Sequence, residues 1–231
     1  MEETPYPRRM RKSYDMPSIA EGFFFMNKEK QKVRFYIDGF NFYYGLKHKN
    51  WKKYYWLDMV SFCEKFIHSH QEVVEVCYFT AIPINKGKQD RQDLFLSANK
   101  LNQKFSLFLG KFFKKQIKYK DRIIDTFEEK QTDVNIAVKM IRDVVLEKCD
   151  ISILVTADSD LVPPIDFIRE YKPKHKIFTY FPPTHFSYDL KKKANNIISL
   201  EHHEMKFQNS LLKDEIKLEN GYILKKPDKW K

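Results

Sequence analysis

Short apolar runs alternate along this chain with segments in which apolar residues recur every three or four positions. Runs typical of strands cover residues 33–37, 73–82, 151–156 and 176–181, and two short strands are predicted within 107–120, around Lys114-Lys115. Helices are predicted over residues 42–46, 57–68, 89–103, 132–148 and 165–171. Strands that alternate with helices predict a three-layer α/β/α fold around a central, mainly parallel sheet.

The clearest helical pattern covers residues 132–148. Its apolar positions follow the i, i+3, i+4, i+7 spacing of one helix face, and Thr132 precedes them as a candidate N-cap. We therefore expect the face that packs on the sheet to carry Val134, Ala137, Val138, Ile141 and Val145.

The alternating pattern divides the chain into three parts. Residues 1–30 hold the basic run Arg8-Arg9-Met10-Arg11-Lys12 and little periodicity, so we expect a flexible, polar arm. Residues 31–205 are expected to form the folded, catalytic domain, and residues 206–231 a charged tail. Met26 directly precedes the folded pattern and is an alternative start of translation.

Charge is the compositional property that bears most on function. The chain has 231 residues and a formal net charge of +11, while 42% hydrophobic residues are typical of a globular protein. An excess of lysine and arginine favours a polyanionic partner, with nucleic acid ahead of an anionic membrane surface. A basic protein without such a partner is the alternative.

Cysteine usage and apolar run length bear on the location of the protein. Cys63, Cys77 and Cys149 are widely spaced, which predicts buried thiols in a reducing compartment and not disulfides or a zinc site. No apolar run approaches the roughly 20 residues that span a bilayer. We therefore expect a cytoplasmic protein without a membrane partner.

Acidic residues stand at the ends of several predicted elements. Asp158 and Asp160 follow the strand at 151–156, Asp38 ends the strand at 33–37, and Asp133 opens the helix at 132–148. If these two strands are neighbours, their carboxyl ends lie on one edge of the sheet, where α/β proteins bind ligands. Such carboxylates, with the amide of Asn41, would form an all-oxygen site that suits Mg²⁺ or Mn²⁺.

Each of these acids also has an ordinary structural explanation. Asp133 would be favoured by the helix dipole alone, Asp160 could cap a helix, and Asp38 followed by Gly39 is a common turn pair. The residues by themselves leave both interpretations open.

Three segments resemble the motifs of one known family, the NYN domain, a branch of the PIN-like nuclease superfamily. Tyr36-Ile37-Asp38-Gly39-Phe40-Asn41 resembles its first-strand motif, and residues 129–137 and 154–163 resemble its second and third motifs, in the same order. With residues 187–200, which resemble the closing helix and strand, the similarity covers about residues 33–200.

The resemblance implies a PIN-like fold and a metal-dependent nuclease that acts on RNA more often than on DNA. The catalytic, metal-binding acids would be Asp38, Asp133, Asp158 and Asp160. Asn41 would orient the metal or the substrate, while Thr156 and Ser159 would support the pocket.

The chain departs from the family pattern at a few positions. Lys139 replaces a common acid, and Asn195 stands where the closing motif often has Asp. Thr156-Ala157 replaces the usual Ser-Gly, and Leu161 the usual Phe. Lys139 and Asn195 would weaken the site or change its substrate if they belong to it.

A second candidate surface follows the first motif. Residues 47–56 combine four lysines with four aromatic residues. Lysines attract phosphates and exposed rings stack on unpaired bases, which predicts nucleic-acid contacts by Lys49, Trp51, Lys52 and Lys53. The alternative is that the rings belong to the core and the lysines are only solvated.

We interpret the chain as a metal-dependent ribonuclease, and an endonuclease in particular. The alternative is an RNA-binding or regulatory module of the same fold that cuts little. A haloacid-dehalogenase-like phosphatase would need an acid where Phe40 stands, and no Gly-x-Gly-x-x-Gly or Gly-x-Ser-x-Gly motif occurs. The oligomeric state stays open, with a homodimer among the options.

Overall fold

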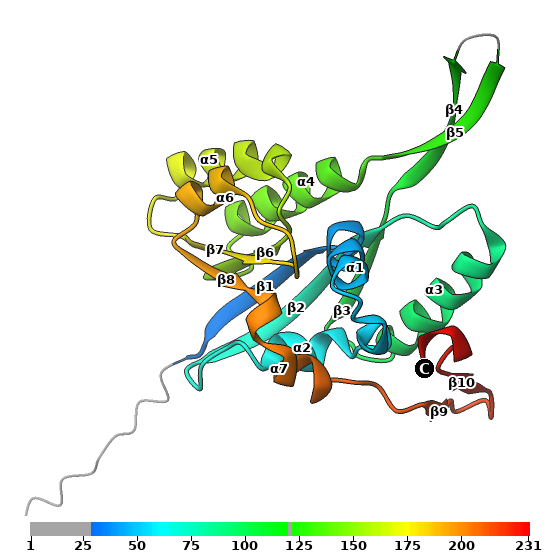
Figure 1. The fold of residues 1–231 in the computed structure, drawn as a ribbon. Coiled ribbons are helices and arrows are strands. Elements are labelled where there is room, and N and C mark those ends of the chain that lie inside the picture. Colours follow the sequence, from blue (N-terminus) through cyan, green and yellow to red (C-terminus); the bar gives the residue numbers. More distant parts are fainter. Residues whose placement is uncertain (1–28, 120–121) are drawn as a thin grey trace, which may run out of the picture.

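A six-stranded parallel sheet forms the centre of the protein in the computed structural model, which describes residues 29–119 and 122–231 (Figure 1). The strand order is β3-β2-β1-β6-β7-β8. The strands are β1 (Gln31–Asp38), β2 (Gln71–Thr80), β3 (Phe105–Leu109), β6 (Ile151–Val155), β7 (Lys176–Phe181) and β8 (Asn196–Ser199). The predicted three-layer fold is confirmed, whereas most of the predicted N-terminal arm, with Met26, lies outside the described residues.

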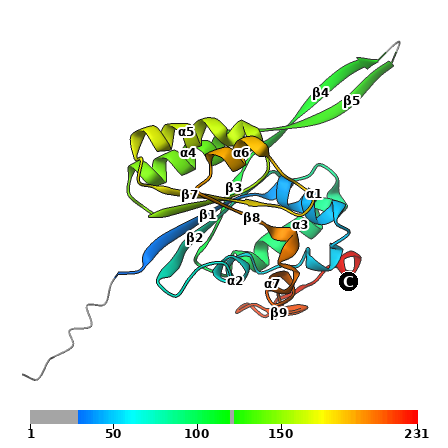
Figure 2. The same ribbon diagram turned by 60° about the vertical axis from the view of Figure 1, so that its left-hand side comes forward.

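Helices cover both faces of the sheet (Figures 1 and 2). One face carries α1 (Gly39–His48), α2 (Met59–Glu64), α3 (Lys86–Asn99) and α7 (Glu204–Gln208). The other carries α4 (Thr132–Val145), α5 (Val162–Tyr171) and α6 (Tyr188–Lys193). Short 3₁₀ turns connect these elements: η1 (Lys52–Tyr54), η2 (Ser159–Leu161), η3 (Leu200–His202) and η4 (Asp228–Trp230).

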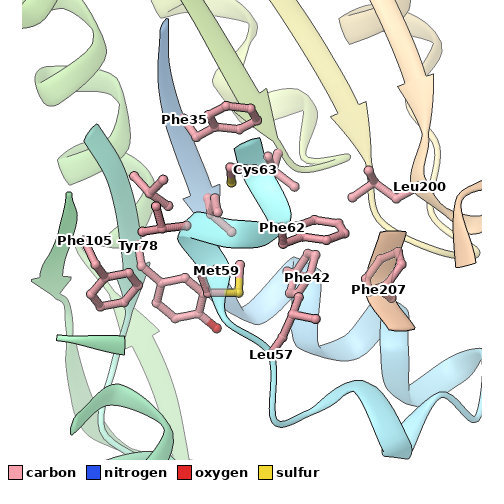
Figure 3. Packing of buried hydrophobic residues seen from close by; sticks show 14 of the residues in the cluster. Phe35, Phe42, Leu57, Met59, Phe62, Cys63, Tyr78, Phe105, Leu200 and Phe207 are labelled. Atoms are coloured by element: carbon pink, nitrogen blue, oxygen red, sulfur yellow. The ribbon is translucent and has the colours of Figure 1, made fainter. Parts of the chain in front are cut away.

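Two cores lie on the two faces because alternate side chains of a strand point to opposite sides. In β1, Phe35 and Ile37 join the core under α1 and α2, and Tyr36 joins the core under α4 and α5. Around α2 the first core is aromatic: the ring centroids of Phe62 and Phe207 are 4.4 Å apart, and Phe42 packs on both (Figure 3). The three thiols are buried and free, as predicted.

The C-terminal segment, expected to be a separate charged tail, packs on the domain. Phe207 is fully buried in the core shared with α1 and α2, and Leu224 is buried as well. The indole Nε1 of Trp56 donates a hydrogen bond to the carbonyl oxygen of Lys213 at 2.9 Å. The segment forms a small hairpin of β9 (Glu215–Lys217) and β10 (Ile223–Lys225), so its lysines belong to a folded part of the domain.

Helix α4 packs through a face that is rotated from the predicted one, and of the predicted residues only Ala137 and Ile141 contact the core. Its buried apolar residues are Ile136, Met140 and Val144, whereas Val134 and Val138 are 63% and 58% exposed. The helix is apolar on more than one side, and its buried side also contains the charged Asp143, so periodicity alone did not place the centre of the buried face correctly. Its cap also differs: Gln131 is the N-cap, and the Glu129 side chain accepts the N–H of Thr132 at 3.2 Å.

An antiparallel hairpin arm projects from the body between β3 and α4 (Figures 1 and 2). It consists of β4 (Lys111–Tyr119) and β5 (Arg122–Lys130). The predicted strand break at Lys114-Lys115 was wrong, because the chain turns at Gly110, where a Cβ atom would lie 2.8 Å from the carbonyl oxygen of Lys130. Strand β5 was not predicted, because its sequence does not alternate regularly between apolar and polar residues.

The remaining differences concern element ends. The helix predicted over 57–68 is confined to Met59–Glu64. None of the helices within residues 29–119 and 122–231 has the length and apolar character that crossing a membrane requires.

Candidate metal centre

Asp38 is fixed at the carboxyl end of β1, one of the two central strands. As the N-cap of α1, it accepts backbone N–H bonds from Phe40 at 3.1 Å and Asn41 at 3.0 Å. Its second oxygen accepts the Thr156 hydroxyl at 3.0 Å. Burial raises the pKa of Asp38 even though these hydrogen bonds oppose the shift.

Asp158 and Asp160 follow the neighbouring strand β6 on the same edge. β1 and β6 are neighbours and pair in parallel, so their carboxyl ends coincide. The N–H of Asp158 donates to the Thr156 hydroxyl at 3.1 Å, and its carboxylate accepts the N–H of Asp160 at 2.9 Å. Thr156 therefore connects Asp38 to the Asp158 loop, while Ser159 is exposed.

Asp133, in the first turn of α4, completes the group of four acids. Its pKa is raised to about 6, first by burial and then by the negative charges of Asp38, Asp158, Glu129 and Asp160. Asp133 therefore lies within electrostatic range of the other three predicted acids, and Asp38 lies within range of Asp158.

The chemistry of this donor set suits a hard divalent cation. In the part of the chain that the structure describes, none of the four carboxylates forms an ion pair with Lys, Arg or His. Uncompensated carboxylates repel one another, and Mg²⁺ or Mn²⁺ with oxygen ligands would remove that repulsion. The residues present therefore fit such an ion.

Another group of potential ligands, more closely spaced than the four acids, lies away from this edge. Ligand atoms of Glu75, Cys77 and Asp143 lie within 4.8 Å of one another. Arg34 contacts Glu75 at 2.6 Å and Asp143 at 2.7 Å, and Lys139 contacts the same two acids at 3.1 and 2.7 Å. Two cations already neutralise two carboxylates here, so this cluster is an ion-pair network and not the better metal site.

Both notable departures from the family pattern lie outside the four-acid group. Lys139 belongs to the ion-pair network just described. The Asn195 side-chain oxygen accepts the N–H of Ile177 at 2.8 Å, near the amino end of β7 and thus on the opposite edge of the sheet. Neither residue alters the acids at the carboxyl edge.

Two histidines near the acids were missed by the sequence argument. Asn41 Oδ1 accepts the N–H of Ala157 at 3.1 Å and also Nδ1–H of His185 at 3.1 Å. The other ring nitrogen of His185 lies 3.3 Å from Nδ1 of His48. Burial and His48 lower the pKa of His185, which favours its neutral form. Its position just after the parallel strand β7 is the one sequence signal that could have marked it.

Of the residues predicted to contact nucleic acid within 49–53, the structure leaves the lysines at the surface but buries the aromatic ring. Trp51 is buried against Tyr54 and Phe207, with centroid distances of 5.4 and 5.2 Å, so its ring is not available to stack on a base. The amino groups of Lys49 and Lys53 lie 3.6 and 3.0 Å from Glu201 and Glu204. Lys52 is exposed. Helix α7, far away in sequence, covers the aromatic side of this segment.

Comparison with known proteins agrees with this architecture. One relative, 6-hydroxy-3-succinoylpyridine 3-monooxygenase HspA of Pseudomonas putida, is 27% identical over 185 residues, which are 63% of this chain and 58% of that protein. The chain thus spans little more than half of that relative's length. A protein of unknown function from Vibrio parahaemolyticus has a similar crystal structure, with a TM-score of 0.53 and 24% identity over 80% of this chain and 98% of that one, which supports the fold alone. The NYN domain model matches residues 32–201, and the chain belongs to the NYN domain family.

Proposed function

We propose that the protein is a metal-dependent ribonuclease that hydrolyses phosphodiester bonds within RNA. The observation that carries this proposal is the gathering of Asp38, Asp133, Asp158 and Asp160 at the carboxyl edge of the central strands, where no cationic side chain of the described residues pairs with them. Membership of a family of nuclease-like domains supports the same reaction class.

Asp38, Asp133, Asp158 and Asp160 would hold one or two Mg²⁺ or Mn²⁺ ions. Such an ion supplies Lewis-acid activation of the phosphate and of an attacking water. The chain itself contributes rigidity, because backbone N–H groups and Thr156 fix the Asp38 carboxylate. Neutral His185, hydrogen-bonded to Asn41, has a ring nitrogen able to accept a proton beside the site.

The hairpin arm supports RNA as the partner. Its first strand carries exposed lysines and no acidic residue over Lys111–Tyr119. The arm starts at Gly110, where an added Cβ atom would lie 2.5 Å from the hydroxyl of Thr132. Thr132 is the residue directly before Asp133, so the base of the arm is close to the acids. A basic strand at the entrance to an acidic site can hold the phosphates that flank the bond to be cut. The preference for RNA over DNA rests on the family resemblance.

A weakly active RNA-binding module has less support, because Lys139 and Asn195, the departures that would favour it, both lie outside the four-acid group. The name of the Pseudomonas relative suggests another candidate, a reaction on a small ring compound. The observation in its favour is a cavity lined by aromatic side chains, whose wall includes Gly39 and Phe40, the two residues that follow Asp38.

Cleavage assays on labelled RNA test the proposal. Single-stranded RNA, structured RNA and single-stranded DNA would be incubated with the protein in Mg²⁺, Mn²⁺ or EDTA. We expect RNA cleavage with either metal, none in EDTA, and loss by orders of magnitude in Asp158→Asn. Asp150→Asn is the matched control, since Asp150 accepts the N–H of Lys32 at the opposite edge of the sheet. Cleavage that persists in EDTA or in Asp158→Asn would refute the mechanism.

A further inference from the structure

A cavity of about 360 Å³ lies between α1, α3 and the base of the hairpin arm. Aromatic rings from distant parts of the chain form much of its wall: Phe40, Tyr43, Tyr44, Tyr55, Phe112 and Trp230. Its volume is near the lower end of the roughly 300–1,000 Å³ typical of small-molecule sites. The space therefore suits one planar group with its substituents.

The charged groups that line the cavity are all positive. They are Lys88 and Arg91, one turn apart on α3, and none of the acidic residues within 29–119 and 122–231 lines the cavity. Neither forms an ion pair with any other residue that the structure describes. Since aromatic walls favour a flat ring and two cations favour an anion, the cavity suits an aromatic group that carries a negative charge.

Polar atoms add hydrogen-bonding capacity inside this wall. Gln92, which also lines the cavity, donates to the Thr80 hydroxyl at 3.0 Å, while its own Oε1 is buried and accepts no hydrogen bond among the described residues. Burial and the nearby Tyr43 raise the pKa of Tyr55 to about 12, so its hydroxyl stays neutral and can donate. A ligand with N–H and oxygen groups at the edge of its ring would find partners here.

Phe40 connects the cavity to the acidic site. Its backbone N–H donates to the Asp38 carboxylate, and its ring lines the cavity and packs on Phe112 of β4 at 5.9 Å. A strand whose phosphate lies at Asp38 can therefore reach the cavity with an adjacent nucleotide.

We propose that this cavity binds one unpaired nucleotide of the RNA, next to the phosphate that is cut. The base would stack on the rings, and Arg91 and Lys88 would bind its phosphate. This inference rests on the proposed function and adds a substrate requirement to it. A base inside a double helix cannot enter the cavity without leaving its stack, so the site selects single-stranded segments.

Binding measured in EDTA tests the cavity separately from cleavage. Fluorescence anisotropy would give the Kd of a labelled single-stranded RNA for the wild type, Tyr44→Ala and Arg91→Gln. Both residues are at least partly exposed, so these variants are expected to fold. Matched controls are Tyr171→Ala, an exposed ring on α5, and Lys100→Gln beyond the other end of α3.

We expect Tyr44→Ala and Arg91→Gln to weaken RNA binding about five- to hundredfold, the range typical of base stacking and phosphate contacts, and the controls to change it less than twofold. Removing one base from the RNA should weaken its binding to the wild type by a similar factor, and should weaken its binding to Tyr44→Ala only slightly. Equal binding by the cavity variants and the controls would overturn the inference, even if metal-dependent cleavage is observed. The inference would also be overturned if nicotinate, a small aromatic acid, bound in a way that depends on Tyr44 and Arg91 while RNA binding did not depend on them. Loss of cleavage with cavity-dependent RNA binding intact would instead contradict the proposed reaction.

Discussion

Asp133→Asn should stabilise the metal-free protein above pH 6. The pKa of Asp133 is raised from 3.8 to about 6 by burial and neighbouring carboxylates, so the folded state holds its proton more tightly than the unfolded state. The associated stability is present below about pH 4, is lost as the pH rises through 6, and leaves a cost above it.

The size of this cost follows from the pKa shift. About two pKa units correspond to roughly 3 kcal/mol, which solvent at this half-buried position reduces to about 1 kcal/mol. Asparagine removes the charge with little change in shape. For a chain of this size, a gain of about 1 kcal/mol raises Tm by roughly 2–4 °C.

Thermal unfolding in EDTA at pH 8 and pH 4 checks the prediction. We expect the higher Tm for Asp133→Asn at pH 8 and no difference at pH 4. In Mg²⁺ the order should reverse, because the wild type gains binding energy that the variant loses. A lower Tm of the variant in EDTA at pH 8, or an equal gain at pH 4, would refute the reasoning.

Asp143→Asn is the control of opposite sign. Asp143 is more deeply buried than Asp133, and it pairs with Arg34 and Lys139. Its replacement leaves buried positive charge uncompensated, which typically costs about 3–5 kcal/mol. A stabilised Asp143→Asn would show that the ion pairs of Asp143 do not compensate its charge, and would contradict the contrast with Asp133.

Three further predictions concern residues outside the acid group. Lys139→Met should lower stability in urea by about 3 kcal/mol, because Glu75 and Asp143 lose a cation, and should leave the Mg²⁺ affinity measured by calorimetry unchanged; a weakened affinity would place Lys139 in the metal site. Phe207→Ala should cost about 3–5 kcal/mol in the same unfolding assay, because the ring is fully buried, and a cost below 1 kcal/mol would mean that the C-terminal segment is not part of the core. His185→Ala should lower the cleavage rate about 10²-fold and remove a titration below pH 6.5 from the pH–rate profile, since burial lowers the pKa of this histidine; an unchanged profile would exclude it as a base.

The edge that carries the acids could be predicted because it depends on local signals and one general rule. Asp38 and Asp158 each follow an apolar run, and parallel strands bring their carboxyl ends together. Asp133 could be placed there because it opens a helix that begins at this edge and leads back to the amino end of the next strand, β6.

Features that depend on distant pairing could not be read from the local pattern. Arg34 and Lys139 make the charged Asp143 compatible with the buried face of α4, and no local period signals such a partner. Trp51 is buried by Phe207, which lies far along the chain. His185 follows β7, and only the folded topology shows that β7 lies beside β6.

The Thr156 hydroxyl has a consequence for the choice of ion. It donates its single proton to Asp38 and accepts the N–H of Asp158, so one atom ties the two strand ends together at a set spacing. Mg²⁺ requires oxygen ligands at about 2.0–2.1 Å in a near-octahedral arrangement, while Ca²⁺ accepts about 2.3–2.6 Å and irregular shells. Because both acids are held through the Thr156 hydroxyl, they cannot move apart independently to fit a larger ion. The centre should therefore select by ionic radius and bind Ca²⁺ poorly even when Mg²⁺ is scarce. Thr156→Ser would retain that discrimination, whereas Thr156→Val, which keeps the shape but lacks the hydroxyl, would relax it.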